Sequence, residues 1–379
     1  MTQVTEKKTV QPKSRFRTKG IQALFGLLMG AMISSFVLRE EVTITLTGVL
    51  FILLMAVISF IVTVMIHETG HAIGGKLGGM EVMNLSYGPL VYAKVNGKSR
   101  FFFKLPSLGY IGRAVMRFPE QVSDEAMRKK LLRMIYAGPV SNIITGGVAL
   151  IIGYFIWPSG IILTFAMVSL FLGLTNLASI ETPAGVMTDG KIISMLKERE
   201  PGAEVILVSH KLLQEDPTGA GHWKRETVER TEHIIRRYPD RPLAAFLLVT
   251  IGPYYYGSDP ARFLELTDGR VFKNRTNKAV VLQDMIDTAA ATGLYFAGKL
   301  CETDNIEEKL QLISDKNEVS GYMRDAYLAI VRGENSQALA SLDQADRAIG
   351  EWHPLYLEGA IEKKVTQEIR NSLKINEDL

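Results

Sequence analysis

The stretch that decides the fold is residues 42–71, which read VTITLTGVLFILLMAVISFIVTVMIHETGH. Its apolar part, Val42–Ile66, is longer than the roughly 20 residues that a helix needs to cross a bilayer. The run ends in His67, Glu68 and His71. An ionised group at the centre of a bilayer costs roughly 2.5–3.5 kcal/mol, so polar residues that end such a run indicate a functional site.

The pattern His67-Glu68-Thr69-Gly70-His71 suits one metal ion bound on one face of a helix. Residues four apart share a helix face, so both imidazoles can reach a zinc ion at about 2.0–2.1 Å. Glu68 then stands beside the open coordination position, where it can act as general base and general acid. The alternative is a chance pentapeptide, which the composition would produce at a rate on the order of one per cent. Its place at the end of an apolar run argues against chance.

Two histidines leave catalytic zinc one protein ligand short. The single cysteine, Cys301, excludes a cysteine-rich zinc site and an internal disulfide. The other histidines all lie in the second half of the chain, at positions 210, 222, 233 and 353. Two carboxylates at the end of the last apolar run remain, Glu181 and Asp189. Asp189-Gly190 could instead be a simple turn, as in the repeated tripeptide at 267–269.

The chain contains four apolar runs of spanning length, at residues 21–38, 42–66, 131–157 and 161–180. Basic residues crowd the segment before the first run and the segment between the second and third. The four runs therefore predict a multi-pass membrane protein, and we expect it in a bacterial cell membrane. The positive-inside rule predicts that both termini are cytoplasmic. The first run lacks a clear cleavage site, so we interpret it as a span rather than a signal peptide. A formal net charge of +3 gives no indication of nucleic acid as a partner.

A β-hairpin is predicted between the second and third runs. Residues 91–95 and 99–104 flank Asn96-Gly97, which is the strongest short hairpin signal. Such a hairpin could hold an extended peptide by adding it to an edge strand. It could also lie on lipid through residues 101–103, all of which are phenylalanine.

The second half of the chain is charged and helical in pattern. Ala338, Leu342 and Ala345 are spaced by four and three, as in the second helix of a tetratricopeptide repeat. This half is either a repeat-like domain that binds a protein partner or a plain helical appendage. We therefore predict an all-α polytopic membrane protein with a small membrane-associated β-hairpin. Its predicted domains are a basic N-terminus (1–20), a transmembrane domain (21–193) and a soluble helical domain (194–379).

Three motifs together resemble the site-2 protease family of intramembrane zinc metalloproteases. They are the histidine motif at 67–71, Ala137-Gly138-Pro139-Val140-Ser141-Asn142, and Asp189-Gly190, and they come in the order of that family. The resemblance covers residues 42–193.

The resemblance implies one zinc ion held by His67, His71 and Asp189, and it favours Asp189 over Glu181 as third ligand. It implies that Glu68 is the catalytic acid and base. Asn142 and Asn176 could hold the substrate or the oxyanion, although asparagine between helices also serves as interhelical glue. The last motif departs from the family pattern, because Thr188 replaces a leucine and Asn176 lies far from the next proline.

The expected activity is therefore that of a zinc-dependent intramembrane endopeptidase. Its substrate would be a membrane protein or membrane-bound peptide, cut in or near a transmembrane segment within the lipid bilayer. The competing hypothesis is a catalytically silent membrane scaffold whose helical domain recruits partners. An intact Glu68 and only three convincing ligands argue against a closed structural zinc site.

Overall fold

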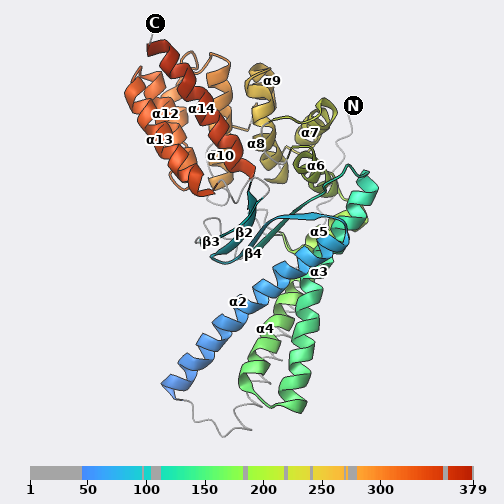
Figure 1. Ribbon diagram of the computed structural model, residues 1–379. Helices are drawn as coiled ribbons and strands as arrows, with labels where there is room; N and C mark the ends of the chain where they lie inside the picture. Colours follow the sequence, from blue (N-terminus) through green and yellow to red (C-terminus); the bar gives the residue numbers. More distant parts are fainter. Residues whose placement is uncertain are drawn as a thin grey trace, which may run out of the picture. The chain divides into compact units, whose positions relative to one another are not determined.

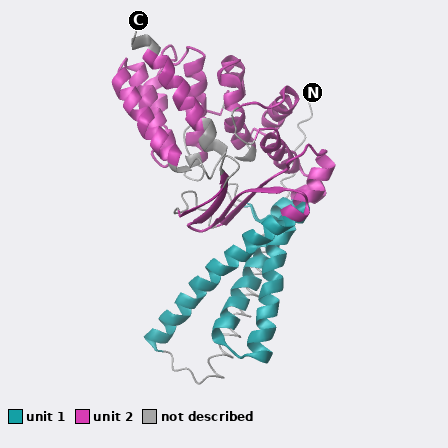
Figure 2. Ribbon diagram, in the orientation of Figure 1, with its two compact units in different colours: residues 1–74, 132–181, 187–194 teal, residues 75–131, 182–186, 195–379 magenta. Residues whose placement is uncertain are grey.

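The computed structural model describes part of the chain. The described residues are 45–95, 98–103, 112–181, 187–216, 221–239, 242–268, 270–271, 280–352 and 357–377. The predicted first span at 21–38 and the basic N-terminus lie outside them. Contacts divide the chain into two compact units (Figure 2). Unit 1 contains residues 1–74, 132–181 and 187–194, and unit 2 contains the rest.

Three long apolar helices supply most of unit 1 (Figure 1). They are α2 (Leu46–Leu77), α3 (Asp124–Ile151, continued by the π-helix η1 at Ile152–Ile156) and α4 (Gly160–Leu177). Each is long and apolar enough to cross a membrane. In the described part of the chain, these three helices meet that condition. They confirm that the last three predicted spans are long apolar helices. The boundaries differ, because α2 carries the histidine motif inside the helix and α4 ends three residues before the predicted limit.

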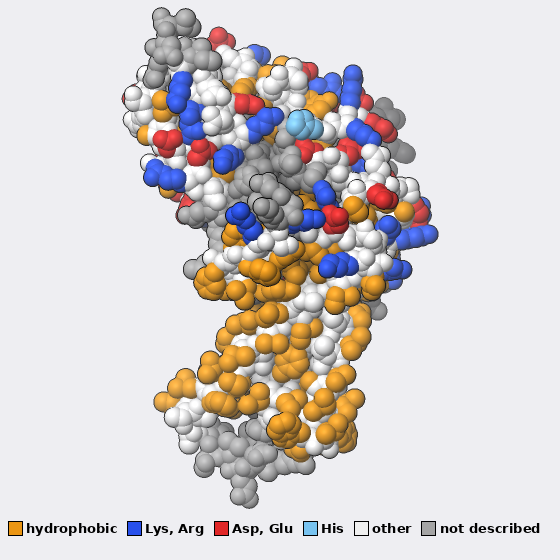
Figure 3. All heavy atoms as spheres, viewed as in Figure 1, with side chains coloured by type: hydrophobic (Ala, Val, Ile, Leu, Met, Phe, Trp, Pro, Cys, Tyr) orange, Lys and Arg blue, Asp and Glu red, His pale blue; other side chains and the backbone are white. Residues whose placement is uncertain are grey.

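Small residues let the helices of unit 1 approach closely. A Cβ added at Gly74 would lie 2.5 Å from the Cβ of Ala137, and one at Gly70 would meet the side chain of Ser141. Membrane helices pack in this way because lipid provides no hydrophobic driving force between them. Their outer surface carries exposed apolar side chains such as Leu50, and Figure 3 shows hydrophobic side chains covering the helices of this unit.

Unit 2 contains a four-stranded antiparallel sheet of order β3-β2-β1-β4. Its strands are β1 (Glu81–Tyr87), β2 (Leu90–Val95), β3 (Lys98–Phe103) and β4 (Gly112–Arg117). The predicted hairpin is confirmed as β2 and β3, but it is half of a larger sheet. The sequence signal for β1 and β4 is weaker. β1 turns into β2 through Gly88-Pro89, which is not one of the strongest hairpin dipeptides, and β4 pairs with β1 from far along the chain.

The three phenylalanines of β3 do not share one face. Phe101 and Phe103 are 83% and 77% exposed, and Phe103 pairs with Leu90, which is 50% exposed. Phe102 pairs instead with buried Val91 on the opposite face. Side chains alternate along a strand, so an anchor on one face of the hairpin could use Phe101 and Phe103 but not Phe102, and contact with lipid stays a prediction.

Most of the rest of the described chain is helical (Figure 1). They are α5 (Asp189–Glu198), α6 (Pro201–Glu215), α7 (Arg225–Arg237), α8 (Pro242–Tyr256), α9 (Pro260–Thr267), α10 (Val280–Phe296), α11 (Ile306–Gln311), α12 (Glu318–Val331), α13 (Asn335–Trp352) and α14 (Leu357–Glu377).

The predicted repeat-like segment forms the helix pair α12 and α13. Gly333 takes a left-handed conformation, with φ of 74°, in the turn between them. Ala338, Leu342 and Ala345 are fully buried in the core of the helical part. A helical hairpin is thus present, whereas its partner, its soluble character and the domain boundaries at 20 and 193 stay predictions.

Candidate metal centre

Three ligand atoms from two helices of unit 1 converge on one point. His67 and His71 lie one turn apart on α2, and Asp189 opens α5. The Nε2 atoms of His67 and His71 are 3.1 Å apart. The Oδ2 atom of Asp189 is 3.0 Å from Nε2 of His67 and 3.4 Å from Nε2 of His71. Tetrahedral ligands at about 2.0–2.2 Å from zinc are about 3.3–3.6 Å apart, so this triangle is close to the size that one ion requires.

The chemistry of these groups also fits a cation. Both imidazoles are buried, and Oδ2 of Asp189 is a buried atom whose near neighbours are the two imidazole Nε2 atoms. Burial alone would raise the pKa of Asp189, but the neighbouring imidazoles outweigh it and hold that pKa at about 2. The site therefore offers one carboxylate and two imidazole nitrogens, a set that suits zinc.

The rival carboxylate lies elsewhere. Glu181 is exposed and forms an isolated antiparallel bridge with Met187. In the described part of the chain, the ligand group that contains both histidines includes Asp189 and not Glu181. This geometry favours Asp189 as the third ligand.

The ring of His71 is fixed by α3. Its Nδ1 atom lies 3.0 Å from the carbonyl oxygen of Met134. A carbonyl can only accept, so Nδ1 carries the proton and Nε2 keeps its lone pair for a metal. Gly138, one turn further along α3, makes room for the ring. A Cβ there would lie 2.5 Å from Nε2 of His71 and 2.8 Å from its Nδ1.

The ring of His67 meets the next turn of α3. Its Nδ1 atom is 3.1 Å from Nδ2 of Asn142, whose side chain is fully buried. The backbone oxygen of Asn142 accepts a hydrogen bond from Ser169 of α4 at 3.0 Å. The structure therefore brings Asn142 into contact with the candidate metal ligand His67.

Asp189 is positioned by its two neighbours in sequence. The hydroxyl of Thr188 donates to the carbonyl of Ala178 at 2.5 Å and accepts from the backbone N–H of Ile180 at 3.1 Å. A Cβ at Gly190 would collide with the carbonyl of Leu177, so glycine allows α5 to start against the end of α4. Thr188, which departs from the family pattern, thus ties α5 to the end of α4.

The remaining predicted site residues are Glu68 and Asn176. Glu68 is buried beside the first ligand on α2, with 8% of its surface exposed. Asn176 is half-buried in the last turn of α4, and the structure records no hydrogen bond from its side chain to other described residues. The sequence analysis missed Met134 and the role of Gly138. Met134, Gly138 and Asn142 follow one another at intervals of four, which places all three on one face of α3 and was the available signal.

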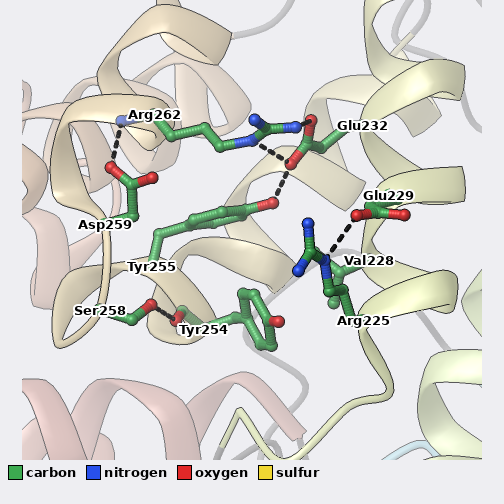
Figure 4. Close-up of a pocket in the computed structure, with 9 residues that line it drawn as sticks. All are labelled: Arg225, Val228, Glu229, Glu232, Tyr254, Tyr255, Ser258, Asp259 and Arg262. Carbon is green, nitrogen blue, oxygen red and sulfur yellow. Dashed lines mark hydrogen bonds and ion pairs between the residues drawn. The ribbon is translucent and has the colours of Figure 1, made fainter.

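A separate cavity of about 280 Å³ lies among helices α7, α8 and α9 (Figure 4). Arg262 forms two hydrogen bonds of 2.8 Å with buried Glu232, which also accepts one from Tyr255. Arg225 pairs with Glu229 at 2.7 Å. Four of the charged side chains that line this cavity are thus paired with one another, and Asp259 accepts from the backbone N–H of Arg262, which is typical of a polar packing site between helices.

Comparison with known proteins identifies one family. Residues 55–162 match the sequence model of Peptidase family M50, the site-2 protease family. The match includes His67, Glu68, His71 and Asn142 and ends before Asp189. Neither a search of curated proteins nor a search of solved structures gave a match. The resemblance to this metalloprotease family is confirmed, and together with the three apolar helices it indicates an integral membrane protein.

Proposed function

Starting from the match of residues 55–162 to Peptidase family M50, we propose that the protein is a zinc-dependent intramembrane endopeptidase. It would hydrolyse a peptide bond in or near a transmembrane segment of a membrane protein or membrane-bound peptide. The observation that carries this proposal is the convergence of His67, His71 and Asp189 next to Glu68 on an apolar helix. Ionisable residues in a membrane span raise the free energy of inserting it, and they usually mark a functional site.

The three ligands would hold one zinc ion, which when bound supplies a Lewis acid that polarises a carbonyl and makes water nucleophilic near neutral pH. Glu68 takes the proton that the attacking water loses and later gives it to the nitrogen of the leaving amine. The C–N bond of the substrate breaks, and the products are a carboxylic acid and an amine. Asn176 remains a candidate for holding the substrate backbone.

Water must reach a site that begins in an apolar helix. The hydroxyl of Thr63 lies one turn before His67, is buried, and has no hydrogen-bond partner among the described residues. A buried polar atom without a protein partner is a natural site for an ordered water molecule. We propose that the face of α2 that carries Thr63 and His67 borders a polar cavity between the spans.

The sheet is our candidate for presenting the substrate. A helical peptide bond is shielded, so the substrate must be held extended before it is cut. Strands β3 and β4 are the two edges of the sheet, and an edge strand can accept an added strand. Exposed Phe101 and Phe103 on β3 would contact lipid at the same time.

We further propose a multi-pass protein of a bacterial cell membrane, with cytoplasmic termini and a helical C-terminal part that binds a protein partner. A reporter fused after Leu379 would test the orientation. Reporter activity on the cytoplasmic side supports it, and activity outside the cell contradicts it.

The test of the activity compares the natural chain with Glu68→Gln on a panel of single-span membrane peptides, with bound zinc measured in both. We expect one zinc ion in each and cleavage by the natural chain alone. Zinc in both with no cleavage of any peptide would favour the alternative of a silent membrane scaffold.

A further inference from the structure

One face of α3 carries three successive contacts to the two imidazoles. Residues 134, 138 and 142 are four apart, so they lie above one another on the helix. The first gives its carbonyl to Nδ1 of His71, and the second makes room for that ring. The third, Asn142, meets Nδ1 of His67 at 3.1 Å. Each imidazole thus has its outer nitrogen engaged by α3.

An imidazole that binds a metal through Nε2 must carry its proton on Nδ1, and that proton needs an acceptor. The carbonyl of Met134 provides this for His71. For His67, the recorded partner among the described residues is the carboxamide of Asn142. Its Oδ1 atom is buried and has no hydrogen-bond partner in the described part of the chain. The two ends of a carboxamide are nearly equal in size, so a half-turn of this group would bring the oxygen to Nδ1.

We propose that Asn142 is a positioning residue for the metal centre: its Oδ1 accepts the Nδ1–H of His67 and so keeps Nε2 free for zinc. This assigns Asn142 to holding the ligand, in place of the substrate or oxyanion role that the sequence suggested. The inference rests on the metal centre of the proposed function and does not depend on the peptidase activity.

The choice of asparagine has a physical reason. With no metal bound, the carboxamide can donate to Nδ1, and His67 can then give its Nε2 proton to Asp189, which lies 3.0 Å away. With metal bound, the other end of the same group accepts. An aspartate at 142 could only accept when ionised, and it would add a buried negative charge to a site that already holds Glu68 and Asp189. Asparagine serves both states without a charge.

The test measures zinc affinity of the purified full chain by competition with a chromophoric chelator, beside the visible spectrum of the cobalt-substituted protein. Asn142→Leu removes the acceptor and keeps the size, and Asn142→Asp keeps an acceptor. Thr164→Val is the control, because the hydroxyl of Thr164 bonds the carbonyl of Gly160 in its own helix, α4, and contacts no ligand. Asn142→Ala replaces the leucine variant if that protein does not accumulate in the membrane.

We expect Asn142→Leu to bind zinc about 10–100 times more weakly and to shift the cobalt spectrum. Asn142→Asp should stay within a few-fold of the natural chain, and Thr164→Val should be unchanged. Equal zinc affinity in the leucine variant and the natural chain would overturn the inference, as would an aspartate variant weaker than the leucine variant, which indicates packing alone. A natural chain that binds no zinc refutes the metal centre itself. If the zinc affinities of the natural chain and the variants rank as predicted but no peptide is cleaved, only the proposed activity is refuted.

Discussion

Gly138→Ala tests how tightly α3 holds the ring of His71. The added Cβ would lie 2.5 Å from Nε2 and 2.8 Å from Nδ1 of that ring, whereas ordinary contact begins at 3.4 Å. The nearest ring atom, Cε1, would be 2.4 Å away. The ring must therefore move by about 1 Å to reach ordinary contact, or α3 must move away. The 3.0 Å hydrogen bond to the carbonyl of Met134 resists movement of the ring. A misplacement of about 1 Å near a reacting centre can reduce the rate by about 100-fold.

The control is Gly147→Ala on the same helix, where an added Cβ meets nothing within 4 Å. Both substitutions replace glycine by alanine inside α3, and each gains roughly 0.5–1 kcal/mol of helix stability. The difference between them therefore isolates the collision with His71.

The assay is zinc content and peptide cleavage of both variants after purification in the same detergent. We expect Gly147→Ala to match the natural chain, and Gly138→Ala to lose zinc and to cleave about 100 times more slowly. Full zinc content and a normal rate in Gly138→Ala would refute the reasoning, because they would mean that the ring yields at no cost.

Three further predictions concern other parts of the chain. Gly190→Ala should lower zinc content, because its Cβ would collide with the carbonyl of Leu177 and displace Asp189; normal zinc content would contradict this. Burial lowers the pKa of His210 to about 4, below its value of about 6.5 in an unfolded chain. The unfolded chain then binds the additional proton, so stability should fall from pH 6.5 to pH 4, and thermal unfolding of a His210→Leu variant should lack that part of the slope. Arg262→Met should lower the free energy of unfolding by about 1–3 kcal/mol, since it leaves buried Glu232 without its cation, and an unchanged urea midpoint would refute this.

The membrane part of the fold follows from the sequence because lipid allows few alternatives. A spanning segment must satisfy its own backbone hydrogen bonds, so a long apolar run predicts a helix. The start of α3 at Asp124, seven residues before the predicted limit, was harder to locate. Residues 124–130 include five charged side chains. Hydropathy detects the apolar part of a helix and not its polar continuation beyond the bilayer.

The metal ligands were predictable for a different reason. His67 and His71 are fixed relative to each other by local helix geometry, whereas Asp189 joins them through tertiary packing. The sequence alone left Glu181 as a rival, and the contacts of Thr188 with the end of α4 separate the two. Such contacts have no local sequence signal.

The role of Asn142 was the least accessible. An asparagine in a membrane helix can bind substrate, join helices or orient a ligand, and composition does not distinguish these roles. Only the 3.1 Å contact with His67 and the unpartnered oxygen point to one of them. The extent of the sheet was also missed, because β1 and β4 pair through contacts far apart in the sequence.

The measurement that tests the central claim most directly is the zinc content of Asp189→Asn beside that of Glu181→Gln and the natural chain. The three-ligand site requires the carboxylate of Asp189 and makes no use of exposed Glu181. We predict one zinc ion per chain in the natural protein and in Glu181→Gln, and a large loss in Asp189→Asn. Full zinc in Asp189→Asn with loss in Glu181→Gln would contradict the site described above.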